Sequence, residues 1–274
     1  MSEWILIGVF MSCSKLKIIC FSPTRTTRRI LDAIAEGIEA DSVEIMDVTR
    51  SDKVPGCYGC SDDDLVIIGA PVYSGRIPVA AVERFSALKA AGTAVVPVVV
   101  YGNRAYEDAL LELADLTDAA GFKAIAAAAF IGEHSFSNEK TPIAVSRPDA
   151  VDLQKAREFG RRLSEIYTSG DFNKSQSIEI PGNNPYKARS PKASASPISD
   201  DNCELCGSCE RVCPTDAITV GSLVETDPEK CIFCCACVKV CAFDARQMTI
   251  PKILEVSKWL ADNFSERREP EIFV

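Results

Sequence analysis

The feature that most constrains this chain is a pair of cysteine runs near its C-terminus. The runs are Cys203-x2-Cys206-x2-Cys209-x3-Cys213, followed by Pro214, and Cys231-x2-Cys234-x2-Cys237-x3-Cys241. Each cysteine of the second run lies 28 residues after its counterpart in the first, and flanking residues repeat at the same interval. An internal duplication at fixed spacing indicates one structural unit used twice. Thiolates at this spacing are typical ligands of two [4Fe–4S] clusters.

The duplication also predicts which cysteine serves which cluster. In two-cluster ferredoxins the fourth cysteine of each run ligates the other cluster. The sequence therefore assigns one cluster to Cys203, Cys206, Cys209 and Cys241, and the second to Cys231, Cys234, Cys237 and Cys213. Two zinc sites are the alternative, because zinc also uses C-x2-C pairs. Cys235 corresponds to Gly207 in the first run, so the repeat predicts that it is not a ligand.

Length and composition narrow the class of protein. A chain of 274 residues accommodates two domains. The number of cysteines, 13, is odd, and the two runs have the spacing of cluster ligands. Both facts argue against a secreted disulfide framework. The net charge of −9 argues against nucleic-acid or anionic-membrane binding. We recognise no signal peptide and no apolar run long enough to span a bilayer, so we expect no membrane span. We also expect the protein to lie in a reducing cytoplasm, that of an anaerobe.

Before the cysteines, apolar runs alternate with amphipathic helical patterns. The expected strands are 16–21, 43–48, 65–70, 94–101 and 123–131, and the expected helices are 26–39, 79–88, 106–120 and 149–167. Five strands alternating with helices predict an α/β fold, with a parallel sheet covered on both faces. The expected organisation is an extension (1–14), a sheet domain (15–168), a linker (169–199), a cysteine domain (200–250), and a helix with a tail (251–274).

The turn after the first expected strand carries a candidate phosphate site. Its residues are Ser22, Thr24, Arg25, Thr26 and Thr27, and it opens directly into a helix. Several hydroxyls and the free N–H groups of a helix N-terminus suit a phosphate monoester. Ordinary helix capping by serine or threonine is the alternative.

Two further loops follow strands at the edge where open α/β sheets bind ligands. Their candidate residues are Pro71, Val72, Tyr73, Ser74 and Gly75 in one loop, and Tyr101, Gly102, Asn103 and Tyr106 in the other. Each loop combines an aromatic ring with a glycine, which lets backbone approach a flat ligand. A phosphate turn beside two aromatic loops predicts bound FMN.

These segments resemble a known family. Residues 22–27 are similar to the phosphate loop of flavodoxins, and 69–78 and 101–106 resemble the flavin loops of the flavodoxin–ferredoxin fusion family of anaerobes. Residues 132–137 and 263–270 are similar to that family too. The resemblance implies a flavodoxin-like, doubly wound five-stranded sheet that binds FMN, followed by a small α+β two-cluster ferredoxin domain. Arg25 replaces the usual glycine, and Ala242 replaces the proline after the last cysteine.

The predicted function is electron transfer between FMN, two [4Fe–4S] clusters and redox partner proteins, with no catalytic residue assigned. Residues 200–250 contain nine acids and four bases, which predicts a basic docking face on a partner. One alternative is an FMN-dependent reductase of a small substrate that the clusters supply with electrons. Another is an electron-wiring subunit of a larger complex. The oligomeric state is left open.

Three other residues stand out in the sequence. Cys57 and Cys60 form a C-x2-C pair with no second pair nearby, and we expect this pair to be incidental. His134, the only histidine, follows the fifth expected strand. It is predicted either to bond the flavin or to steady a neighbouring loop.

Overall fold

The computed structural model describes residues 13–50, 58–61, 64–170, 178–189, 191 and 193–274. Most of the predicted N-terminal extension, and Cys57, lie outside these residues. Among the described residues, no helix combines the length and apolar character needed to cross a membrane.

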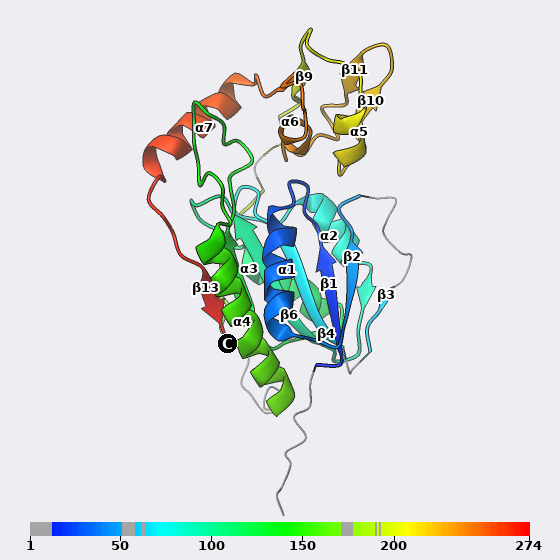
Figure 1. Cartoon of the computed structure of the whole chain (residues 1–274), viewed down its shortest axis with the longest axis vertical. Coiled ribbons are helices and arrows are strands. Elements are labelled where there is room, and N and C mark those ends of the chain that lie inside the picture. Colours follow the sequence, from blue (N-terminus) through cyan, green and yellow to red (C-terminus); the bar gives the residue numbers. More distant parts are fainter. Residues whose placement is uncertain (1–12, 51–57, 62–63, 171–177, 190, 192) are drawn as a thin grey trace, which may run out of the picture.

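A largely parallel sheet forms the centre of the molecule (Figure 1). Its strands are β1 (Lys15–Cys20), β2 (Ser42–Asp47), β4 (Leu65–Pro71), β6 (Ala94–Tyr101), β7 (Lys123–Ala124), β8 (Ala127–Ile131) and β13 (Glu271–Phe273). The parallel strands run in the order β2-β1-β4-β6-β8, which is the order of flavodoxin-like sheets. The predicted fold class is therefore confirmed. The fifth expected strand is divided into β7 and β8, which both pair with β6.

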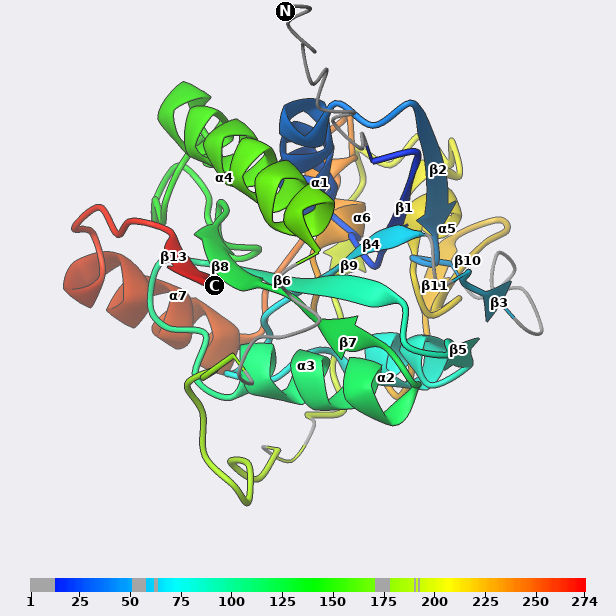
Figure 2. The ribbon, with the colours of Figure 1, turned by 90° about the horizontal axis from the view of Figure 1, so that it is seen from below.

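Helices cover both faces of this sheet, as Figure 2 shows. On one face lie α1 (Thr26–Ile38) and α4 (Ala150–Ser169), and on the other α2 (Val79–Phe85) and α3 (Ala109–Ala119). Because both faces are covered, β4 and β6 are buried along their whole length. Helices α1 and α4 cross closely, since a Cβ atom on Gly160 would lie 2.1 Å from the carbonyl oxygen of Ile34.

The C-terminal tail returns to the sheet, which the sequence did not predict. Strand β13 pairs antiparallel with β8, with Ile272 opposite Ala128. Three mostly exposed residues carry no strand pattern of their own, so this pairing depends on the tail reaching an open sheet edge.

The cysteine region is small and built from short elements. These are β9 (Ile198–Ser199), α5 (Ser208–Val212), β10 (Ile218–Val220), β11 (Val224–Thr226), α6 (Ala236–Lys239) and β12 (Arg246–Gln247). Helix α7 (Pro251–Asn263) then leads to the tail, and β3 (Tyr58–Gly59) pairs with β5 (Leu88–Lys89) beside the main sheet.

The duplicated sequence has a duplicated backbone. Three pairs of residues 28 positions apart share a left-handed conformation: Leu205 and Phe233 (φ 51° and 55°), Gly207 and Cys235 (73° and 56°), Asp216 and Asp244 (49° and 51°). A non-glycine residue adopts this conformation rarely. Its repetition at three positions indicates that both runs fold around the same kind of centre.

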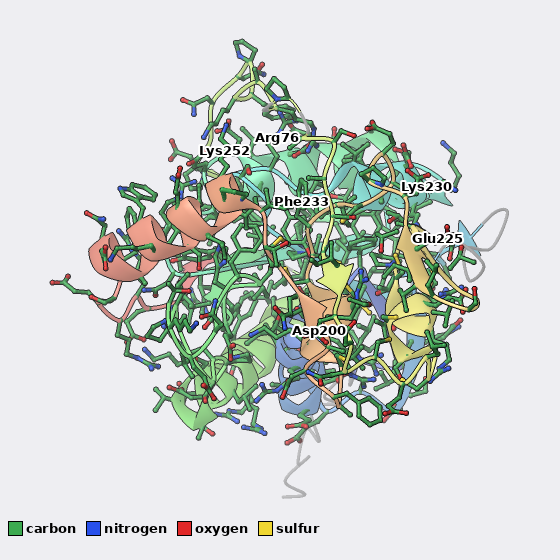
Figure 3. The ribbon with its side chains drawn as sticks, turned by 90° about the horizontal axis from the view of Figure 1, so that it is seen from above. Arg76, Asp200, Glu225, Lys230, Phe233 and Lys252 are labelled. Atoms are coloured by element: carbon green, nitrogen blue, oxygen red, sulfur yellow. The ribbon has the colours of Figure 1, made fainter. Side chains whose placement is uncertain are left out.

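The cysteine region lies over the carboxyl ends of the parallel strands, above the predicted ligand loops (Figure 1). Seen from above in Figure 3, it covers this edge of the sheet, and α7 extends to one side. The chain reaches it through residues 178–189, which are bound to the sheet domain. The fully buried Asp108 accepts hydrogen bonds from the backbone N–H groups of Asn183 (2.8 Å) and Lys187 (2.6 Å).

Candidate functional site

The predicted phosphate turn lies between β1 and α1. The hydroxyl of Ser22 accepts a hydrogen bond from the backbone N–H of Arg28 at 3.1 Å, and the hydroxyls of Thr24 and Thr26 lie 3.2 Å apart. Part of the turn therefore does cap the helix. Thr27 differs, because its hydroxyl is fully buried and has no hydrogen-bond partner among the described residues. An unsatisfied buried hydroxyl at a helix N-terminus suits an anionic ligand.

Arg25 has a left-handed backbone, with φ of 65° and ψ of 0°. This conformation explains the usual glycine at the position, since glycine adopts positive φ without steric cost. The turn still closes, because the backbone N–H of Arg25 donates to the carbonyl of Ser22 at 3.1 Å.

The loop after β4 is a tight two-residue turn. Tyr73 and Arg76 exchange two backbone hydrogen bonds, of 2.8 and 3.2 Å, and both Ser74 and Gly75 have positive φ. Glycine is required at position 75, because a Cβ atom there would lie 2.1 Å from the carboxylate of Glu107. The turn fixes Tyr73 beneath the cysteine region. Burial raises the pKa of the Tyr73 phenol well above its usual value, and the nearby Cys234 and Cys235 thiols raise it further.

The loop after β6 is held mainly by the C-terminal tail. The buried amide of Asn103 donates to the carbonyls of Phe264 (2.6 Å) and Glu266 (2.8 Å), and the hydroxyl of Tyr106 donates to Glu271 at 2.8 Å. The side chains of Asn103 and Tyr106 are thus engaged by the tail. Their predicted contact with a flavin stays a prediction, while Tyr101 is buried in the core beside Tyr106.

His134 lies against this loop. A Cβ atom on Gly102 would approach the His134 ring to 2.2 Å, so the glycine permits the contact. His134 Nδ1 accepts a hydrogen bond from the backbone N–H of Phe136 at 3.1 Å. Burial, followed by the positive charges of Arg104 and Lys239, lowers the pKa of His134 to about 4. The neutral ring therefore packs against the neighbouring loop, which is one of the two predicted roles.

The cysteines of the two runs surround two separate cavities. Cys203, Cys206, Cys209 and Cys241 line the first, which we call the outer cavity. Cys213, Cys231, Cys234 and Cys237 line the second, which we call the inner cavity. The structure thus brings together the two sets that the sequence proposed, each with three cysteines from one run and one from the other.

Each cavity is bordered by four of the predicted ligand cysteines. Among the described residues, no three histidine, cysteine or acidic side chains are grouped so that they could hold a single metal ion. Four thiols around one cavity are the ligand set of a [4Fe–4S] cluster. Cys235 also borders the inner cavity, but it adds a fifth thiol beyond the four that the repeat assigns.

The two cavities differ in their exposure. In the outer cavity Cys206 is exposed, and the Ser208 hydroxyl and backbone hold the pKa of its thiol below the usual value. In the inner cavity Cys234 and Cys237 are buried, and burial raises the pKa of both thiols. Three of the four inner cysteines are buried (Cys213, Cys234 and Cys237), whereas Cys209 is the one buried cysteine among the outer four.

The inner cavity also faces the sheet domain. Ile232 packs on the hydrophobic core that includes residues from the loop side of the sheet, and Arg84 reaches up from α2. The buried Arg84 donates to the carbonyl of Pro214 at 2.5 Å and to that of Val48 at 2.7 Å. Lys239 donates to the carboxylate of Glu133 (2.7 Å) and to a backbone carbonyl of the same loop.

Several of these residues were missed by sequence reasoning. Arg84 and Lys239 appear in the sequence as ordinary charged residues of helices, with no pattern that predicts a contact more than a hundred residues away. Cys60, by contrast, is half-buried, and burial raises the pKa of its thiol although the charge of Lys17 opposes the rise, so the thiol is not activated by a lowered pKa.

Comparison with known proteins gives one local family match and several similar folds. Residues 197–219, which span the first run, match the family model described as a 4Fe-4S binding domain. A search of curated proteins found no match. Among solved structures the chain is similar to an archaeal flavodoxin, with 14% identity over 56% of this chain and 98% of that one, at a TM-score of 0.38.

Two further solved structures are similar to part of this chain. A flavodoxin, WrbA-like protein from Agrobacterium tumefaciens has 16% identity over 57% of this chain and 98% of its own, at a TM-score of 0.37. A flavodiiron core from Synechocystis has 16% identity over 58% of this chain, at a TM-score of 0.40, and the match spans 37% of that chain. Strand order and the matched cysteine region together support a redox role in electron transfer.

Proposed function

We propose that this chain carries electrons between FMN, two [4Fe–4S] clusters and redox partner proteins, as in the flavodoxin–ferredoxin fusion family. When bound, a cluster exchanges one electron at a time and FMN exchanges one or two. The chain's own residues hold these groups, set their distance and control access to solvent.

The residues present fit a flavin phosphate at the first turn. The Thr27 hydroxyl is buried and has no hydrogen-bond partner in the described part of the chain, and a phosphate oxygen would accept its hydrogen bond. The positive end of α1 and the charge of Arg25 add attraction for an anion. Tyr73 and the turn at Ser74–Gly75 lie at the next strand end, the place where a flavin ring would continue from the phosphate.

The packing of Ile232 carries the proposal, because Ile232 lines the inner cavity and packs on the same hydrophobic core as Val72 of the Tyr73 loop. The charges of Cys234 and Cys235 also act on the pKa of the Tyr73 phenol. A cluster held by the inner cysteines would therefore lie near the predicted flavin loop. The outer cavity, with its exposed Cys206, would meet a partner protein. We further propose that this partner presents a basic face to the acidic cysteine region.

Anaerobic purification tests the cofactor content. The proposal expects about eight iron and eight sulfide ions for each chain, with about one FMN. A colourless protein, or one with zinc in place of iron, would refute it.

The second measurement is kinetic: after rapid reduction of the clusters, reduction of the flavin should proceed at a rate independent of protein concentration. A rate proportional to concentration would mean that electrons pass between molecules instead.

A substitution at Thr27 tests the phosphate site by itself. Thr27→Val removes a hydroxyl that has no partner among the described residues, so the flavin-free protein should be as stable as the parent or more so. Binding of FMN should weaken about tenfold or more, because a hydrogen bond to a charged group is lost. Thr27→Ser keeps the hydroxyl and serves as the control, with affinity near the parent's. Unchanged FMN affinity in Thr27→Val would remove Thr27 from the site.

A further inference from the structure

Arg246 is a buried cation between the two cavities. It lines the outer cavity, and its side chain is only 3% exposed. Its Nη2 group donates to the sulfur of Cys237, an inner-cavity cysteine, at 3.9 Å. One guanidinium thus borders both sets of cysteines.

Among the described residues, no carboxylate is paired with the guanidinium of Arg246. Its hydrogen bonds go to the neutral hydroxyls of Ser199 (3.2 Å) and Thr226 (2.9 Å) and to the Cys237 sulfur. Within the described residues Arg246 forms no ion pair with a carboxylate, and its buried Nε has no hydrogen-bond partner. Burying a charge without an opposite charge is costly, so an anion is required nearby.

The repeat shows that the fold does not need an arginine here. The residue 28 positions earlier is Ile218, which is buried in the apolar cluster around Cys209 and Cys213. An apolar side chain therefore fills the equivalent position of the first run. The charge at Arg246 is a departure from the duplication, placed where two sets of thiolates lie on either side.

We propose that Arg246 is the shared counter-charge of both clusters, and that it raises their reduction potentials. This inference rests on the proposed function, because it requires the clusters. A [4Fe–4S] group with four thiolate ligands has a net negative charge, and one-electron reduction adds one more without making or breaking a bond. A fixed positive charge at low local dielectric stabilises the reduced state more than the oxidised one.

The test is a reductive titration with dithionite, in which EPR follows each cluster in the anaerobically purified full chain. Arg246→Ile copies the first repeat and removes the charge. At a fixed applied potential it should lower the reduced-to-oxidised ratio of both clusters at least tenfold, about 59 mV for a one-electron couple. Arg246→Lys, which keeps the charge, should shift the ratio less. The control is Arg211→Gln, which removes an exposed cation beside Cys206 and should have a small, salt-dependent effect because solvent screens it.

The outcomes separate the inference from the proposed function. Wild-type protein without iron and sulfide would refute the function. Wild-type protein with both clusters, together with unchanged potentials in Arg246→Ile, would overturn the role of Arg246 alone. If Arg246→Ile does not assemble clusters, the comparison passes to Arg246→Lys and Arg246→Gln. Potentials nearer to wild type in the lysine variant support the charge role, and equal shifts in both variants overturn it.

Discussion

The two cysteine runs share their spacing and backbone but not their surroundings. In the first run Leu205 is 42% exposed and Cys206 is exposed beside it. In the second run the equivalent Phe233 is half-buried and Cys234 is buried, above the sheet domain. The duplication thus supplies two similar centres, and the contact with the sheet makes them unequal.

Because of this difference, the two cavities are suited to different contacts. The proposed partner protein would meet the outer cavity, which contains the exposed Cys206, while Cys234 of the inner cavity lies near Tyr73 of the predicted flavin loop. The two cavities share Arg246, which borders the outer one and contacts Cys237 of the inner one. The first two predictions below compare equivalent positions of the two runs, and the other two change groups on the side of the inner run.

The largest effect is expected from removing one thiol of each set. Cys206→Ala and Cys234→Ala should each lose about half of the iron, because each removes one of four ligands of one cluster. Only Cys234→Ala should also abolish the reduction of the flavin from the remaining cluster, since it empties the cavity next to Tyr73. Iron analysis and rapid-mixing absorbance measure the two effects. Equal loss of flavin reduction in both variants would contradict the inner and outer assignment.

The second comparison concerns Leu205 and Phe233, which share a left-handed backbone. Glycine at either position relieves a similar backbone cost, about 1 kcal/mol. Leu205→Gly should leave the free energy of unfolding nearly unchanged, because the exposed leucine loses little burial and the backbone entropy of glycine offsets the relief. Phe233→Gly should lower it by about 1 kcal/mol, because a half-buried ring is removed. Anaerobic guanidinium denaturation provides the measurement, and similar midpoints for both variants would contradict the difference in packing.

The third comparison uses His134, the only histidine, which lies on the side of the inner run. Its pKa is about 4 in the folded chain and near 6.5 in an unfolded one. As the pH falls below about 6.5, the unfolded state takes up a proton that the folded state does not. Stability should therefore decline by about 1 kcal/mol between pH 7 and 5.5. His134→Asn, which retains an acceptor for the Phe136 N–H, should flatten this decline, and an unchanged pH dependence would exclude His134 as its origin.

Much of this arrangement was predictable from sequence, for identifiable reasons. Strands such as β6 and helices such as α1 have strong local patterns, and the spacing of the cysteines determines their grouping. What escaped prediction depends on contacts between distant segments. Strand β13 forms only because the tail meets β8, and Asn103 and Asp108 bind backbone groups far along the chain. A local pattern carries no information about such partners.

The smallest expected effect concerns the ion pair that joins α6 of the second run to the sheet domain. The Lys239–Glu133 pair is partly exposed, at 36% and 27%, so it contributes about 0.5 kcal/mol to the docked arrangement. Lys239→Glu should lower the ratio of docked to undocked molecules about twofold or more and slow flavin reduction, with a smaller effect at high salt.

The exchanged pair Lys239→Glu with Glu133→Lys should recover most of the rate, because the attraction is restored with its sign reversed. The same single variant should raise the pKa of His134, since the charge of Lys239 helps to hold that pKa down. The stability decline would then begin to level off at a higher pH than in the parent. Slower flavin reduction with no change in the pKa of His134 would mean that Lys239 acts through its hydrogen bond to the Ser137 carbonyl rather than through its charge.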